Sequence, residues 1–405
     1  MRALVVTFGM IICGNMAIAQ ENPLRDPLSA PITRELAILS SMTGVDEAAI
    51  KRVRSKVDSA LESIDKPDRL FDVMLGHVPP EIFVATMAAA KMELGKSELL
   101  ARYEKDVATR RKFRQDAAAN MFLLQLDRAV GLRTNQWDRA TKVVRELSQN
   151  DALPHIFATE NKKPDSSGTK ALKSLLTDEQ FEFWNKNYAN VRNAVFSPST
   201  FEGNFEKKME ELRTKLRNVA AARTAWLRDE FNLTPAQTRK LELTAKGAIS
   251  RRALLDDRME AEAEFSAILN GQVGRNLEIN ETRLAKADAA TLLSRFGWWR
   301  QLTDKVLTDD QKATRRKLDL KRASLQREAY NKMNVLSVAR ELTLNAEQLI
   351  GFARLIDRAV PPANPDDIGS PYTGLAYLQD IDAADYEKAI GKENWLKLAF
   401  RLNQM

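Results

Sequence analysis

The sequence has little cysteine, histidine, proline and glycine, and each shortage excludes a class of protein. Among 405 residues there are one Cys and two His, too few for a disulfide framework, a zinc cluster or a His-rich metal site. Gly and Pro number 16 and 14, both below average usage, which excludes collagen-like, linker-like and Pro-rich disordered chains. No long apolar run follows the amino terminus, so we expect no membrane-spanning helix.

The first 19 residues have the three parts of a secretory signal peptide. Arg2 gives a positive start, residues 3–13 are apolar, and Ala17-Ile18-Ala19 matches a small-x-small cleavage site. The apolar stretch is shorter than the roughly 20 residues that a bilayer requires. We therefore expect cleavage after Ala19 and a periplasmic or extracellular location. The mature chain would then contain no cysteine and would depend on packing alone.

The charge is mildly basic and spread along the chain. The formal net charge is +7, and loss of the signal peptide with Arg2 lowers it by one. Such an excess permits weak attraction to acidic surfaces but does not indicate nucleic acid or lipid as a partner.

The placement of proline predicts an all-α fold. No proline lies within residues 82–152, and Pro235 is the only one between residues 200 and 360. These stretches are rich in Ala, Leu, Glu, Lys and Arg, which favour helices, and period-two runs typical of strands are missing. We predict tandem helical-hairpin modules joined by long helices, with coiled-coil-like packing and no sheet. Loops are expected at residues 154–169, 197–204, 270–280 and 361–373.

One long helix is expected from residue 209 onward, with a packed apolar seam. The seam consists of Leu212, Leu216, Val219, Ala222 and Trp226. Its spacing is close to the 3.5-residue repeat of packed helices. A strict heptad would place Arg223 in the seam, so the register slips by one residue there. The slip favours a tightly packed hairpin over a long regular coiled coil.

A five-residue pattern, L-T-x-x-Q, recurs where helices are expected to begin. It starts at Leu176, Leu233 and Leu307, and a variant with Asn in place of Thr starts at Leu344. The segment from Leu132 keeps Leu and Gln but has Arg133 at the second position. Segments from Val45 and Ile381 keep only an apolar residue followed by Asp.

Helix capping explains this pattern without a ligand. A Thr or Asn at the N-cap accepts a hydrogen bond from a free backbone N–H, and a Gln three residues later bonds back to the cap's own N–H. The preceding Leu is placed to pack against the fourth helical residue, and Pro235 falls at a first helical position, where proline is tolerated. The structural site residues are therefore Leu176, Thr177, Gln180, Leu233, Thr234, Gln237, Leu307, Thr308, Gln311, Leu344, Asn345 and Gln348.

The repeated L-T-x-x-Q segments resemble those of periplasmic helical proteins of the Spy and CpxP type. The resemblance covers only the motif regions, and this chain is much longer than one such protein. It implies an all-helical exported protein and an ATP-independent chaperone or stress-adaptor role. No client-binding residue can be matched position by position.

The motif spacing suggests modules in chain order. We pair Val45 with Val78, Leu132 with Leu176, Leu233 with Leu307 and Leu344 with Ile381, and expect each module to contact mainly its neighbours. The expected divisions are a signal peptide (1–19), an extended tether (20–34), and helical modules at 35–131, 132–202, 203–332 and 333–405.

Aromatic residues near the motifs are expected to anchor one helix on another rather than to line a peptide-binding groove. They are Phe181, Phe183, Trp184, Trp298, Trp299 and Trp395.

No catalytic, cofactor or metal motif is present in the sequence. Only His77 and His155 could serve a histidine-dependent mechanism, and no G-x-S-x-G segment occurs. The segment 95–97 is Gly-Lys-Ser, but it lacks the upstream glycine of a phosphate-binding loop and is expected within a helix. Asp256, Glu260 and Glu264 share one helix face, which we interpret as solvated, because hard cations need ligands that converge from a loop.

Two basic clusters, at residues 110–112 and 315–317, lack the interleaved aromatic residues of a nucleic-acid site. We therefore expect no nucleic-acid partner. Because no catalytic, cofactor or metal motif is present in the sequence, we also expect no cofactor and no enzymatic activity.

Two functions fit the sequence, both with other envelope proteins as partners. The first is an interaction scaffold or structural component of the cell envelope. The second is a chaperone, which would need a contiguous exposed apolar patch.

Overall fold

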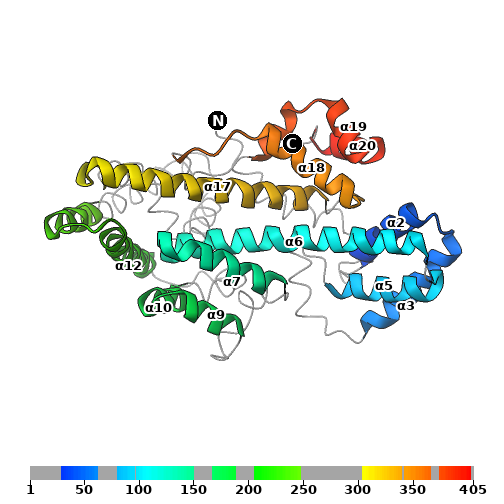
Figure 1. The fold of residues 1–405 in the computed structure, drawn as a ribbon, viewed down its shortest axis with the longest axis horizontal. Helices are drawn as coiled ribbons and strands as arrows, with labels where there is room; N and C mark the ends of the chain where they lie inside the picture. The colour runs from blue at the N-terminus through cyan, green and yellow to red at the C-terminus, as the bar shows by residue number, and fades with distance from the viewer. Residues whose placement is uncertain are drawn as a thin grey trace. The chain divides into compact units, whose positions relative to one another are not determined.

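The fold is known from a computed structural model, which describes residues 29–62, 80–95, 97–149, 167–187, 205–247, 303–339, 342–365 and 374–402. Every regular element in these ranges is an α-helix or a 3-10 helix (Figure 1), so the all-α prediction is confirmed. The described helices are all too short or too polar to serve as a membrane span. The predicted signal peptide lies outside the described residues.

The chain forms two compact units, each built from separate stretches of sequence. Unit 1 contains α2 (Ser29–Thr43), α3 (Glu47–Glu62), α5 (Pro80–Leu94), α18 (Ala346–Ala359), η4 (Gly374–Asp380), α19 (Ala383–Ile390) and α20 (Lys392–Leu402). Unit 2 contains η1 (Thr134–Gln136), α7 (Trp137–Gln149), α9 (Ser167–Leu175), α10 (Asp178–Asn187) and α12 (Phe205–Phe231), with further helical residues at 235–247 and 303–306. The boundary between the units falls within the two longest helices, α6 (Glu98–Val130) and α17 (Asp309–Ala339).

The core of unit 1 corrects the part of the predicted tether (20–34) that the structure describes, residues 29–34. Residues 29–34 begin α2, and Ile32 is buried in a core that it shares with Val53, Ile82 and Tyr103. Pro31 is tolerated because it lies in the first helical turn, where its missing N–H has no intrahelical partner. Three prolines in nine residues suggested an extended chain, but burial of apolar positions that follow Pro31, such as Ile32 and Leu36, favours the helix.

The core of unit 2 gathers aromatic residues from several helices. Trp184 of α10 is buried with its ring 5.9 Å from that of Phe122 on α6, and Trp226 meets Phe231 edge to face at 5.8 Å. In unit 1, Trp395 stacks on buried Tyr386 at 4.7 Å. The predicted anchoring role is therefore confirmed for Trp184 and Trp395.

Phe181 and Phe183 pack, partly buried, against the unit 2 core, as expected for anchors. Trp298 and Trp299 lie outside the described residues.

The seam predicted on the long helix α12 is observed only in part. Trp226 is buried as expected, but Ala222 is half-buried, and the other buried positions here are Ala220, Thr224, Leu227 and Phe231. Arg223 lies against the end of α6, where its Nη2 donates to the carbonyls of Asp127 and Arg128. A guanidinium can lie at a packed face when helix-end carbonyls accept its hydrogen bonds. The side chains of Leu212, Leu216 and Val219 are outside the description.

The linear order of modules is also corrected. Most of the expected first module (35–114) and most of the last (333–361 and 373–405) lie in the same unit, and the Asp106 side chain on α6 accepts a hydrogen bond from Ala346 N at the start of α18. Contacts between modules are therefore not limited to neighbours along the chain.

Gly95 and Ser97, expected within a helix, lie between two helices. Gly95 ends α5 in the left-handed region (φ +63°), and Ser97 caps α6 by accepting from Leu100 N at 3.1 Å.

Candidate functional site: the paired capping motifs

Each L-T-x-x-Q segment forms the predicted reciprocal capping bonds immediately before a helix. The Thr N–H donates to the Gln side-chain oxygen at 3.1 Å for Thr177 and Gln180, 3.0 Å for Thr234 and Gln237, and 2.9 Å for Thr308 and Gln311. The Gln backbone N–H donates back to the Thr hydroxyl at 3.2, 3.3 and 3.3 Å, in the same order. The leucines Leu176, Leu233 and Leu307 are buried in the unit 2 core. Helix 235–247 starts at Pro235, as predicted.

The two variant segments keep the arrangement in whole or in part. Asn345 donates its N–H to Gln348 Oε1 at 3.1 Å and accepts from Gln348 N at 2.9 Å, so the box is complete. Arg133 N–H donates to Gln136 Oε1 at 2.9 Å, but an Arg side chain cannot accept the return bond. The helix that follows Arg133 accordingly begins with the short 3-10 turn η1.

The glutamine amides also join the motifs in pairs, which the sequence did not predict. Gln180 Nε2 donates to Gly131 O at 3.1 Å, and Gln136 Nε2 donates to Leu175 O at 3.3 Å. The two side-chain amides also bond to each other, at 2.8 and 3.2 Å. Each glutamine thus binds the carbonyl that directly precedes the partner motif.

The second pair has a similar arrangement within unit 2, except that one acceptor carbonyl, that of Phe231, lies two residues before the motif. Gln237 Nε2 donates to Val306 O at 2.9 Å and to Gln311 Oε1 at 3.0 Å. In return, Gln311 Nε2 donates to Phe231 O at 2.9 Å. The spacing-based pairings of Leu132 with Leu176 and of Leu233 with Leu307 therefore match the contacts.

The third pair, in unit 1, uses a partner that the sequence analysis missed. Gln348 Nε2 donates to Ile390 O at 2.9 Å, and Asn394 Nδ2 returns a bond to Thr343 O at 3.3 Å. The pairing of Leu344 with Ile381 is thus wrong, because the partner segment is Ile390-Gly391-x-x-Asn394, at the junction of α19 and α20. The sequence held one signal for this segment, an apolar residue (Ile390) followed four positions later by an amide (Asn394). That signal is weak because Gly391, at the capping position, has no side chain with which to cap a helix.

The pairing explains why the last motif position is Gln rather than Glu. Either residue could accept the N-cap N–H in a capping box. Only an amide can accept through its oxygen and donate through its nitrogen at the same time. One side chain thereby satisfies both the free N–H at the start of one helix and the free carbonyl at the end of another.

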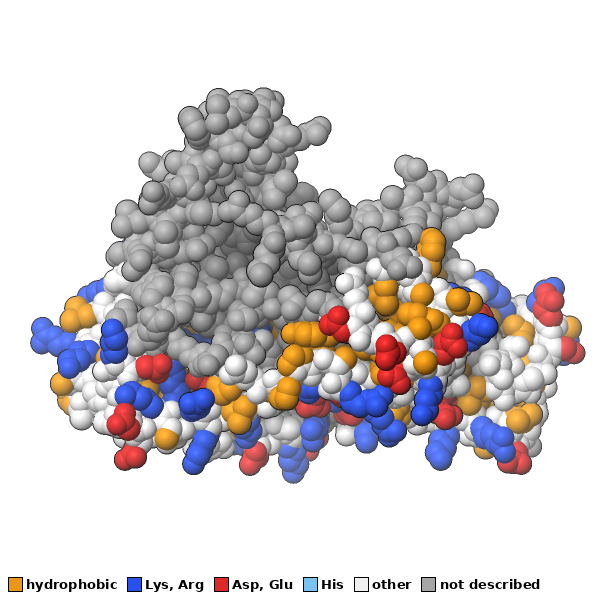
Figure 2. Space-filling view, turned by 90° about the horizontal axis from the view of Figure 1, so that it is seen from above, with side chains coloured by type: hydrophobic (Ala, Val, Ile, Leu, Met, Phe, Trp, Pro, Cys, Tyr) orange, Lys and Arg blue, Asp and Glu red, His pale blue; other side chains and the backbone are white. Residues whose placement is uncertain are grey.

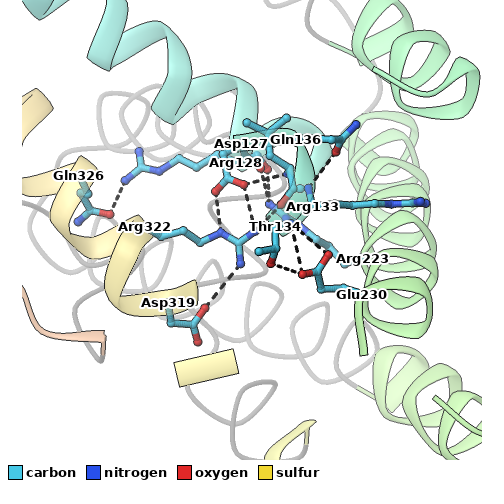
Figure 3. Close-up of polar contacts among 12 residues, drawn as sticks. Asp127, Arg128, Arg133, Thr134, Gln136, Arg223, Glu230, Asp319, Arg322 and Gln326 are labelled. Carbon is cyan, nitrogen blue, oxygen red and sulfur yellow. Dashed lines mark hydrogen bonds and ion pairs between the residues drawn. The ribbon is translucent and has the colours of Figure 1, made fainter. Parts of the chain in front are cut away.

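A buried ion pair lies beside the first motif pair (Figure 3). Arg322 of α17 donates to Asp127 of α6 from Nε at 2.8 Å and from Nη2 at 3.0 Å, and its guanidinium lies 4.6 Å from the Trp226 ring. Burial alone would lower the pKa of Arg322, but the charge of Asp127 holds it above its usual value. Asp127 also accepts from Leu132 N at 2.9 Å. The ion pair therefore fixes the backbone at the start of the motif.

A second set of contacts ties the same motif to the end of α12 (Figure 3). Arg133 Nη2 donates to Asp229 at 2.7 Å. Thr134 N–H and hydroxyl both donate to the Glu230 carboxylate. Together with Arg322, these contacts connect the first motif pair to α12 and α17, two helices that adjoin the second motif pair.

Unit 1 contains a comparable buried cluster next to the third pair. The Arg110 guanidinium donates to both Glu35 oxygens at 2.8 Å and to Asp106 at 2.6 Å, and the Tyr103 hydroxyl donates to Glu35 at 2.6 Å. Burial opposes ionisation of Glu35, but the bonds from Arg110 and Tyr103 lower its pKa below the usual value. Burial and the neighbouring Glu35 charge raise the pKa of Tyr103.

Residues of the two basic clusters are engaged in separate ion pairs. Arg110 of the first basic cluster is buried on Glu35, and Arg315 of the second pairs with Asp304 and Asp319, so neither is a free anion-binding residue. Within the described ranges, no group of His, Cys, Asp and Glu could hold a metal ion.

The acidic residues Asp256, Glu260 and Glu264 and both histidines lie outside the described residues. Comparison of the chain with protein-family models, with curated proteins and with solved structures finds no match.

Proposed function

We propose that this chain is an exported, non-catalytic helical protein that serves as an interaction scaffold or structural component of the cell envelope. The observation that carries the proposal is the use of the motif amides. All four Gln side chains of the first two pairs bond to helix ends within unit 2. The recurrent residues therefore maintain the fold, and recognition is left to the outer helix faces.

The character of the helices supports a scaffold. Trp137, Trp184 and Trp226 are buried, so the large aromatic residues pack helices together. The middle of α17 exposes the charged side chains of Arg316, Lys317 and Lys321, with Leu320 exposed among them. Narrow polar faces over buried aromatic residues suit specific contacts with folded partners better than capture of unfolded chains.

A chaperone of the L-T-x-x-Q type is the second candidate, favoured by the exposed face of α20. Leu396 and Phe400 are 58% and 67% exposed, and their spacing of four residues places them side by side on the helix. Hydrophobic side chains are also visible near the C-terminal helices in Figure 2. Exposed apolar patches on soluble proteins often mark binding sites.

The test combines in-cell cross-linking with an aggregation assay. For a scaffold, we expect a small set of folded partners to be cross-linked reproducibly and to bind saturably when purified. We expect no suppression of aggregation of a denatured client at several-fold molar excess without nucleotide. Suppression that is lost in the L396S/F400S double variant would instead establish the chaperone.

A further inference from the structure

The middle of α17 is strongly basic on its solvent side. Between Lys312 and Arg327 the helix contains seven basic residues and one acidic residue, Asp319. Asp319 is buried and lies 3.4 Å from Arg315 and 3.6 Å from Arg322. The one acidic residue of this stretch therefore balances charge on the inner side of the helix, and the outer side of residues 312–327 carries no negative charge.

The outer side of α17 presents a basic stripe, which we define as Arg316, Lys317, Leu320 and Lys321. All four side chains are exposed, and the four-residue spacing places Leu320 beside Arg316 and Lys321 beside Lys317. Arg316 and Lys317 form no ion pair within the part of the chain that the structure describes. Two positive charges next to one exposed apolar side chain are therefore open to a partner.

Helix α7 holds one end of the basic stripe in place. Lys321 Nζ lies 5.2 Å from the centroid of the buried Trp137 ring and 3.5 Å from an Asp138 carboxylate oxygen. A cation over an aromatic face is attracted by the ring, which orders the lysine side chain. Asp138 would repel a second carboxylate, so it marks the end of the surface that an acidic partner can cover.

The basic stripe opposes the stability of its own helix, in contrast to three other helices of the protein. Lys317 and Lys321 are like charges four residues apart, an arrangement that destabilises a helix. Exposed pairs with this spacing on α3, α6 and α20 have opposite charges, namely Glu47–Lys51 at 2.9 Å, Glu98–Arg102 at 2.7 Å and Glu393–Lys397 at 2.7 Å. A local arrangement that works against the fold is expected where residues serve binding.

We propose that the basic stripe binds an acidic helical segment of a partner protein, with carboxylates at Arg316 and Lys317 and one apolar side chain on Leu320. A row of side chains with four-residue spacing matches the face of a second helix on which glutamates flank an apolar residue. A single leucine offers less apolar surface than a helix that lies in a membrane interface, and the stripe has no aromatic residue on which a base could stack. The inference rests on the proposed scaffold function and names the chemistry of its partner.

The test measures binding of a fluorescein-labelled helical peptide to the purified chain by fluorescence anisotropy. In the peptide, glutamates four residues apart flank one leucine, and the control peptide has glutamine at each of those positions. We expect saturable binding of the glutamate peptide alone, weakened by added sodium chloride. Arg316→Gln/Lys317→Gln should weaken binding about tenfold, the combined effect of two exposed ion pairs. Lys105→Gln/Lys112→Gln, which removes two exposed charges from α6, should change binding by less than about twofold.

Thermal unfolding of the same variants separates a binding role from a structural one. Arg316→Gln/Lys317→Gln relieves repulsion along α17, so it should unfold at or above the wild-type midpoint although it loses binding. The inference is overturned if this variant is less stable than the wild type, if the two peptides bind equally, or if the α6 variant loses as much affinity. Binding of phosphatidylglycerol vesicles in place of the peptide would also overturn it. Folded partners that still cross-link to Arg316→Gln/Lys317→Gln in cells would then leave the scaffold function standing without this site.

Discussion

The motif glutamine performs two structural tasks with one side chain. In Gln180 the side-chain oxygen caps α10, and the nitrogen donates to the carbonyl of Gly131 after α6. The first bond depends on residues three positions apart, and the second on residues 49 positions apart. Local and tertiary structure are therefore joined in a single amide group.

Replacing Gln180 by Glu separates the two tasks. The carboxylate keeps the cap but cannot donate to Gly131 O, which is left facing a negative charge. We expect the free energy of unfolding to fall by about 1–3 kcal/mol, the cost of leaving a buried polar group without its partner. Urea denaturation followed by circular dichroism measures the change. Glu179→Gln in the same exposed turn should remain within about 0.5 kcal/mol, and an equal effect of the two substitutions would refute the dual role.

The Glu35 cluster predicts a loss of stability in acid. Because the folded-state pKa of Glu35 lies below its usual 4.5, its contribution is complete well above pH 4.5 and is lost as the pH falls through the lowered pKa. Glu35→Gln should cost about 3 kcal/mol at neutral pH, because it leaves Arg110 short of a buried counter-charge. Urea unfolding between pH 7 and pH 3 should show the wild type approaching the variant in acid. A constant difference over that range would exclude Glu35 as the group responsible.

At the scale of the helix, the end of α6 is closely packed. Gly131 ends this helix at φ +65°, and a Cβ placed there would lie 2.7 Å from Arg223 Nη1 and 3.2 Å from the Trp226 ring. Gly44 ends α2 at nearly the same φ, +63°, and a Cβ placed there would have nothing within 4 Å. The two glycines differ in surroundings but not in backbone conformation.

Alanine at these two glycines should therefore have different effects. Gly44→Ala should cost about 1 kcal/mol from left-handed backbone strain alone. Gly131→Ala should cost about 1–3 kcal/mol more, because Arg223 and Trp226 must move to admit the methyl group. Thermal unfolding of both variants under identical conditions gives the comparison, and equal losses would argue against close packing at Gly131.

Capping could be predicted from the sequence because it depends on residues three positions apart. Thr177, Thr234, Thr308 and Asn345 all precede helices and form the expected bonds. The cross-bonds could not be predicted, since they depend on how helices distant in sequence meet. Asn394 shows this limit most clearly. In the sequence, Gly391 and Asn394 resemble an ordinary helix end, and only the structure shows that the Asn394 amide donates to the carbonyl of Thr343.

Burial of charge was the second feature that could not be predicted. In the sequence, Arg110 belongs to a basic run typical of a solvated face, yet it is 1% exposed. Its partner Glu35 lies 75 positions away, and nothing in the local sequence of α2 marks that residue as buried. Arg223 on α12 is a similar case, because its acceptors are backbone carbonyls, which have no sequence signal.

At the scale of the whole molecule, Asp106 connects stretches from both halves of the chain. It bonds to Arg110, which binds Glu35 of α2, and to Ala346 N of α18. Asp106→Ala should therefore lower amide protection in α2 and in α18 together, because both lose a shared buried partner. Hydrogen exchange followed by mass spectrometry resolves the two helices. Asp138→Ala, at a side chain exposed on α7, should leave both unchanged, and loss of protection in α18 alone would disprove the connection through Arg110.

The long sequence separations also set an order in which the contacts can form. The first amide pair joins residues 44 positions apart and the second joins residues 74 apart, so each can close within unit 2. The bond from Ala346 to Asp106 spans 240 positions. The helices α2, α3, α5 and α6 share a core of their own, but unit 1 is complete only when α18, from the other end of the chain, joins it.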